Sequence, residues 1–204
     1  MTRSLALGLL LLVTGACTTL PERTYYPDPA SPETRMLAEA LWRTTKAASD
    51  DPNEYSFAMI RSDHVATYTV EDATFYFTQG LARQPTEVVD ALVAHEVAHE
   101  LLGHIGQRRA LALSLGASLI DLLANPLIVR VFTRDQEIAA DLKAVEVLRD
   151  MGYAAPRRAM ADALRAAARV NGRPRGGWLA TEPALEDRLG RLEPLEADAK
   201  QVAK

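Results

Sequence analysis

The stretch HEVAHELLGH, from His95 to His104, determines how the rest of the chain is interpreted. It contains three of the four histidines and has the form H-E-x-x-H. On a helix, His95 and His99 lie about 40° from one another, so both imidazoles can reach one metal ion. Glu96 lies about 100° round the helix, where a carboxylate can accept a proton from an attacking water. The motif therefore predicts two metal ligands and a general base.

Helical signals surround this motif. Pro85 and Thr86 supply a turn and an N-cap, and Glu87 adds a negative charge to the first turn. Spacings of three and four residues predict one buried stripe. The stripe consists of Val88, Leu92, His95, His99 and Leu102. Two ordinary core histidines are the competing interpretation, but that interpretation leaves the glutamate after the first histidine unexplained.

The third ligand has to come from outside this helix. A metzincin would place a histidine ten residues after His95, but that position holds Ile105. On an unbroken helix His104 would point roughly opposite to His95. We therefore expect His104 near the helix end, interacting with the C-terminal dipole and not with the metal.

The strongest donor is Glu137 in the segment TRDQEIAADLKAVEVL. Asp141 follows one turn later on the same face of a second predicted helix. Glu137 as a ligand and Asp141 as the partner of a ligating histidine would leave one coordination position open. The competing interpretation is that both carboxylates belong to the wet face of an amphipathic helix.

Together the motifs resemble the HtpX and CAAX-prenyl-protease-like family of zinc endopeptidases. The second motif is R-x-x-E-x-x-A-D, from Arg134 to Asp141. FYFTQGL, which ends at Leu81, and TEPALEDRLGRL, from Thr181, are similar to other family segments. The resemblance spans about residues 55–192 and implies an α+β fold. It would be a mainly helical zincin-like domain with a small antiparallel sheet beside the metal helix.

The resemblance implies that one zinc ion is held by His95, His99 and Glu137, with Glu96 as the catalytic base. Asp141 would then orient a ligating histidine. Arg134 is expected to be structural and to pair with a carboxylate near Asp141.

Two departures from the family pattern affect the site. The sequence from Val65 to Thr67 replaces a usual Asn-Ala pair, so a customary side-chain hydrogen bond would be missing. Glu182 replaces a family histidine that approaches the metal in some relatives, which makes Glu182 a candidate metal-proximal group.

The first sixteen residues are similar to a bacterial lipoprotein signal peptide. Arg3 precedes an apolar run from Leu5 to Val13, and Cys17 follows Gly-Ala. Cleavage before Cys17 would leave a lipidated N-terminus that anchors the protein to the membrane. Thr18 in place of Asp favours the outer membrane, facing the periplasm. An ordinary secretory signal with a chance cysteine is the alternative.

The length of 204 residues and a hydrophobic content of 48% predict one cored domain. We expect a lipidated N-terminus and tether over 17–30, a metallopeptidase domain over 31–194 and a solvated tail over 195–204. A net charge of −4 without a basic run excludes an obvious nucleic-acid interface.

Within the domain, the pattern predicts a helix over 32–47 and three strands over 55–61, 64–70 and 73–78. The last strand, from Phe75 to Thr78, is expected to pair with an extended substrate. The apolar segment 110–132 should form two core helices rather than a membrane span, because Asn125-Pro126 and several polar residues interrupt it.

The function implied is zinc-dependent endoproteolysis of misfolded or misassembled envelope proteins. Its partners would be protein or peptide substrates and the membrane, contacted through Cys17. The alternative is a zinc-binding lipoprotein that serves the envelope assembly machinery as a chaperone, with latent or no proteolysis. Glu96 argues against the alternative, because a purely structural site needs no base.

Overall fold

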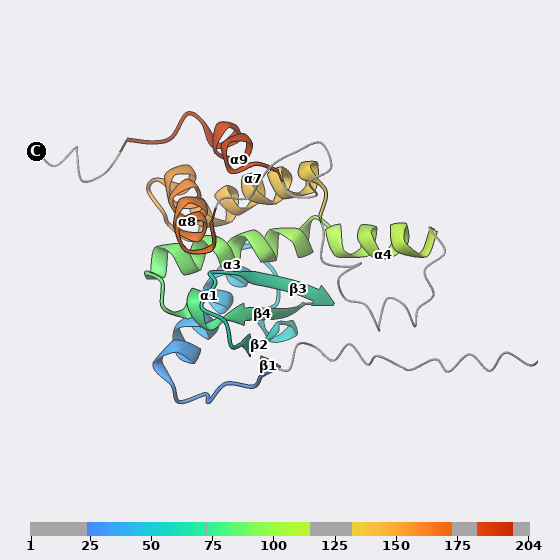
Figure 1. The fold of residues 1–204 in the computed structure, drawn as a ribbon, viewed down its shortest axis with the longest axis vertical. Coiled ribbons are helices and arrows are strands. Elements are labelled where there is room, and N and C mark those ends of the chain that lie inside the picture. Colours follow the sequence, from blue (N-terminus) through green and yellow to red (C-terminus); the bar gives the residue numbers. More distant parts are fainter. Residues whose placement is uncertain (1–23, 72, 115–131, 173–182, 198–204) are drawn as a thin grey trace, which may run out of the picture.

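The computed structural model describes residues 24–71, 73–114, 132–172 and 183–197 (Figure 1). Helices dominate, and the four strands form one sheet, which confirms the expected α+β class. The elements are β1 Thr24–Tyr25, α1 Pro32–Ala47, the 3-10 helix η1 Pro52–Glu54, β2 Ser56–Ile60, β3 Thr67–Glu71, β4 Thr74–Thr78, α2 Gln79–Ala82, α3 Thr86–Leu101, α4 His104–Ser114, α7 Arg134–Asp150, α8 Pro156–Asn171 and α9 Leu185–Leu192.

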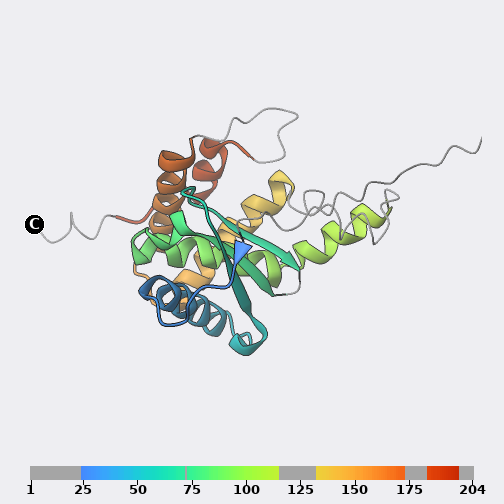
Figure 2. The same ribbon diagram turned by 60° about the horizontal axis from the view of Figure 1, so that its bottom comes forward.

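Helix α3 lies at the centre, between the sheet and helices α7, α8 and α9 (Figure 1). Helix α1 also packs against it (Figure 2). Every residue from Val89 to His99 is buried, a wider surface than the single stripe expected from the sequence. Apolar side chains all round a helix allow burial on every side. The metal motif is therefore held by packing from several directions.

Local sequence signals set the helix starts. Ser31 caps α1 by accepting a hydrogen bond from the Thr34 amide, and Pro32 occupies the first turn. Thr133 and Gln136 form a reciprocal capping box at the start of α7. Because this box fixes where α7 begins, it places Glu137 in the first turn of that helix.

The sheet is mixed, which corrects the antiparallel arrangement expected from the sequence. Its order is β1-β2-β4-β3, with β2 and β4 parallel and the other two pairs antiparallel. Phe75 and Phe77 are fully buried, so β4 occupies an interior position. The threonine-rich β3 takes the edge beside α3. Strand β1 comes from the segment 17–30 that the sequence assigned to a tether.

The expected substrate-pairing role of Phe75–Thr78 is wrong. Strand β4 is paired with β2 on one side and with β3 on the other, so its main-chain groups are already used. Strand β3 is the edge strand next to the metal helix.

Several predictions concern residues outside the described ranges. Cys17, Glu182 and residues 115–131 of the apolar segment all fall there, and α4 covers the start of that segment. None of the described helices combines the length and apolarity that a membrane crossing requires.

Candidate metal centre

Three buried side chains from two helices converge on one point. His95 and His99 come from α3 and Glu137 from α7. The two Nε2 atoms are 3.1 Å apart, and the Glu137 carboxylate oxygens lie 3.4 Å from Nε2 of His95 and 3.6 Å from Nε2 of His99. Among the described residues this is the group that could hold a metal ion. It contains the three residues that the two sequence motifs predicted as ligands.

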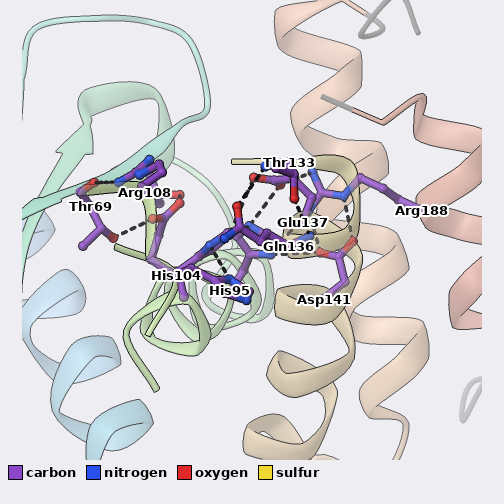
Figure 3. A network of polar contacts seen from close by, with 12 residues as sticks. Thr69, His95, His104, Arg108, Thr133, Gln136, Glu137, Asp141 and Arg188 are labelled. Atoms are coloured by element: carbon purple, nitrogen blue, oxygen red, sulfur yellow. Dashed lines mark hydrogen bonds and ion pairs between the residues drawn. The ribbon is translucent and has the colours of Figure 1, made fainter. Parts of the chain in front are cut away.

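The Nδ1 side of His95 is held by Asp141. Its Nδ1 atom lies 2.9 Å from Oδ1 of Asp141, which itself is buried. Arg188 of α9 donates from Nε to Oδ2 of Asp141 at 2.7 Å and from Nη2 to Oδ1 at 2.5 Å. Its Nη1 atom lies 3.3 Å from Glu137 (Figure 3). Arg188 therefore joins the carboxylates of the site.

The ion pair of Arg188 with Asp141 was not predicted from the sequence. Arg134 lies at the start of α7, one turn before Glu137. The signal for Arg188 was its place in TEPALEDRLGRL, a segment recognised only by resemblance. Its partner Asp141 lies 47 residues earlier, and no helical or strand period relates the two positions.

The charges in this cluster support one another. Burial alone would raise the pKa of Asp141, but Arg188 and His95 hold it below its ordinary value. Burial would also raise the pKa of Glu137, but His95 and Arg188 lower it below its ordinary value. Burial would lower the pKa of His95, but hydrogen bonds to Asp141 and Glu137 raise it to about 10. Both carboxylates are therefore ionised, and the site favours positive charge.

The pKa of His99 shifts in the opposite direction from that of His95. Burial first, and then the neighbouring His95, lower the pKa of His99 far below its ordinary value. The imidazole is therefore neutral and keeps a lone pair for a metal.

His104 does not lie where an unbroken helix would put it. Helix α3 ends at Leu101, and Gly103 adopts a positive φ of 64° before α4 begins. This break brings Nδ1 of His104 to 3.1 Å from Nδ1 of His99. His104 is therefore a buried neighbour of a candidate ligand, although it lies outside the group that could hold the metal.

Glu96 is held by the edge strand. Thr67 donates its hydroxyl to Oε1 of Glu96, and Thr69 donates its hydroxyl to Oε2, both at 2.6 Å. This pair could not be predicted from the sequence: alternate residues of a strand share a face, but only the packing of the strand beside α3 turns that face toward Glu96. Thr67 thus supplies a hydrogen bond at the position where the family pattern was interrupted.

A cavity of about 420 Å³ opens onto these groups. It is lined by residues 65–69 of the edge-strand region, by Glu96 and Glu137, and by parts of α8 and α9. In its wall, Asn171 bonds the main chain of Val65, accepting from its amide at 2.8 Å and donating to its carbonyl at 2.7 Å. The cavity therefore joins the candidate base, the metal group and the sheet edge.

Comparison with known proteins agrees with this geometry. A comparison with curated protein sequences finds no match. The sequence model of peptidase family M48 matches residues 31–196, which include the metal helix, Glu137 and Arg188. Peptidases of this family depend on a metal, and the buried group of two histidines and a glutamate supplies a suitable donor set. The chain belongs to peptidase family M48, a family of metallopeptidases.

Proposed function

We propose that this protein is a zinc-dependent endopeptidase of the HtpX-like type, with His95, His99 and Glu137 as the zinc ligands. Zinc–ligand distances of about 2.0–2.1 Å in a tetrahedral site place neighbouring ligand atoms about 3.3 Å apart. The separations of 3.1, 3.4 and 3.6 Å between the three donor groups are close to this value. The observation that carries the proposal is this donor set, of which His95 and Glu137 line one cavity together with Glu96.

The bound zinc ion would polarise the scissile carbonyl and activate the attacking water. Glu96 accepts the proton of that water and then delivers it to the leaving amine. The hydroxyls of Thr67 and Thr69 orient the Glu96 carboxylate through two hydrogen bonds. Asp141 accepts a hydrogen bond from Nδ1 of His95 and so directs Nε2 into the cluster, where zinc would bind in place of the Nε2 proton.

Strand β3 offers a place for the substrate main chain. The Ala66 carbonyl accepts a hydrogen bond from Thr78 in β4, whereas Val65 bonds Asn171 on the opposite side. Main-chain groups alternate along a strand, so those of Thr67 face the same side as those of Val65. An extended peptide can pair there, gaining affinity with little sequence selection. This mode of binding suits an endopeptidase.

We place the activity in the bacterial cell envelope. Lipidation of Cys17 would anchor the protein, facing the periplasm from the outer membrane, and its substrates would be misfolded or misassembled envelope proteins. This assignment is supported by the signal-like N-terminus and by the family resemblance. A chaperone-like binding protein would have no use for a carboxylate positioned as Glu96 is.

The test compares the full-length protein with Glu96→Gln in zinc content and in cleavage of an unfolded protein such as casein. We expect one zinc ion per chain in both and a loss of about 10²–10⁴-fold in cleavage rate in the variant. Glu39→Gln, which changes an exposed glutamate of α1, is the matched control and should cleave normally. Undiminished cleavage by Glu96→Gln would refute the assigned base, and absence of zinc would refute the assigned centre.

A further inference from the structure

Arg108 on α4 is a buried cation with unused hydrogen-bond donors. Its side chain belongs to a residue that is only 6% exposed. Nη2 donates to the carbonyl of Thr69 at 3.4 Å, a long contact. The Nε and Nη1 atoms have no hydrogen-bond partner within the described part of the chain. Burial of unsatisfied donors on a charged group is unfavourable, so such a group calls for an explanation.

The position of Arg108 relates it to the candidate active site. Its guanidinium carbon lies 3.7 Å from the centre of the Phe132 ring, and that ring stacks on His99 at 3.6 Å between centroids. Arg108 also lines the cavity that contains Glu96 and Glu137. In Figure 3 it lies beside Thr69, on the other side of the histidines from Arg188. Arg108, which carries the unused donors, therefore lines the same cavity as the proposed base.

Glu96 and Glu137, the carboxylates that line the same cavity as Arg108, already have other partners. Both oxygens of Glu96 accept hydroxyl hydrogen bonds from Thr67 and Thr69. Glu137 faces the two histidines and Arg188. A ligand with a carboxylate would offer two oxygen acceptors to the unpaired Nε and Nη1 donors of Arg108 and pair with its charge directly, which a neutral carbonyl cannot do.

We infer that Arg108 forms a carboxylate-binding subsite, which selects peptides that present a carboxylate close to the scissile bond. The inference rests on the proposed peptidase function, because the peptide has to lie along β3. Thr69, whose carbonyl Arg108 contacts, is two residues along the strand from Thr67, a distance of about 7 Å. A peptide paired at Thr67 would therefore place a neighbouring residue within reach of the guanidinium. The carboxylate can belong to an acidic side chain or to the peptide C-terminus.

The experiment uses the zinc-loaded full-length protein and pairs of fluorogenic peptides. In one series Glu replaces Gln at each position flanking the cleaved bond, with both termini blocked. In the other series a free C-terminal acid replaces the amide. The first series detects an acidic side chain and the second a terminal carboxylate. The measured quantity is the ratio of kcat/KM between the charged and the neutral member of each pair.

We expect the unmodified protein to prefer the charged member of at least one pair by about tenfold or more, and Arg108→Gln to abolish that preference. Arg108→Lys should retain part of it, because a point charge remains without the planar fork. Arg149→Gln, which changes an exposed arginine at the far end of α7, is the matched control and should keep the full preference.

Two outcomes would overturn the subsite. One is equal cleavage of charged and neutral peptides by the unmodified protein. The other is an equal loss on both peptides in Arg108→Gln, which would assign Arg108 to a step common to all substrates. Either result would leave the peptidase intact. If no peptide is cleaved, the proposed function fails, and fluorescence anisotropy of the same peptides on Glu96→Gln still tests whether a carboxylate preference exists and depends on Arg108.

Discussion

Replacing Arg188 by glutamine removes the guanidinium that joins Asp141 to Glu137. The exposed fractions of the side chains are 16% for Arg188, 1% for Asp141 and 11% for Glu137, so solvent cannot take over the lost contacts. Two ionised carboxylates would then face one another with His95 as their remaining strong partner. We expect a large loss of stability in the metal-free protein.

The magnitude follows from the burial of this cluster. Removing one partner of a buried ion pair costs about 3–5 kcal/mol in the free energy of unfolding. In a domain of this size each kcal/mol lowers the melting temperature by about 2–4 °C, which gives a decrease of about 6–20 °C. A bound divalent cation supplies positive charge beside Glu137, so the decrease should be smaller in the metal-loaded protein.

The assay is thermal unfolding followed by circular dichroism, with and without a chelator. Arg165→Gln is the matched control, because it removes an ion pair with Asp162 in which both side chains are substantially exposed. The control should lose less than about 1 kcal/mol. If metal-free Arg188→Gln melts within a degree of the unmodified protein, the cluster does not depend on this charge and the reasoning fails.

Three further predictions concern the fold and the site. Gly80→Ala should cost at least about 1–3 kcal/mol in denaturant unfolding, because its Cβ would lie 2.2 Å from main-chain carbonyl oxygens of residues 63–64; unchanged stability would contradict this close approach. Asp141→Asn should weaken zinc binding about 10–100-fold in a competition titration, since a ligating histidine loses its anionic partner; equal affinity would contradict that role. Tyr153→Phe should lose about 1 kcal/mol at neutral pH with the hydrogen bond to Asp90. Burial and that hydrogen bond raise the pKa of Tyr153, so its contribution is complete below the ordinary tyrosine pKa of about 10 and is lost as the pH rises through the higher folded value; a difference between variant and unmodified protein that stays constant above pH 10 would contradict the linkage.

Helix α1 shows how far local signals reach. Ser31 and Pro32 predicted its start, and the structure places the helix at Pro32–Ala47, as expected. Such signals work because a cap and a helical period involve residues a few positions apart. Strands β2, β3 and β4 were also located to within a few residues.

Strand pairing could not be predicted in the same way. The turns suggested a simple antiparallel succession, but β4 lies between β2 and β3. The full burial of Phe75 and Phe77 accounts for this order, and burial depends on what the helices cover. The edge proposed to receive a substrate therefore belongs to β3 and not to β4.

The break between α3 and α4 is a second feature that local sequence signals did not predict. Gly103 was visible in the sequence, and glycine often follows the end of a helix. The position of His104 depends on whether the helix ends at Gly103 or continues through it. The spacing of the histidines did not distinguish these two cases.

The sequence by itself determined that His95, Glu96 and His99 share one helix, because a period of 3.6 residues relates positions only four apart. It also indicated Glu137, but only when a second motif was read together with the first. The tertiary structure alone decided which side chains form hydrogen bonds with Glu96 and with the carboxylates beside the histidines. Thr67 reaches Glu96 across 29 positions and Arg188 reaches Asp141 across 47. Contacts at such separations follow from how helices and the sheet pack in three dimensions, and no short-range pattern in the chain encodes them.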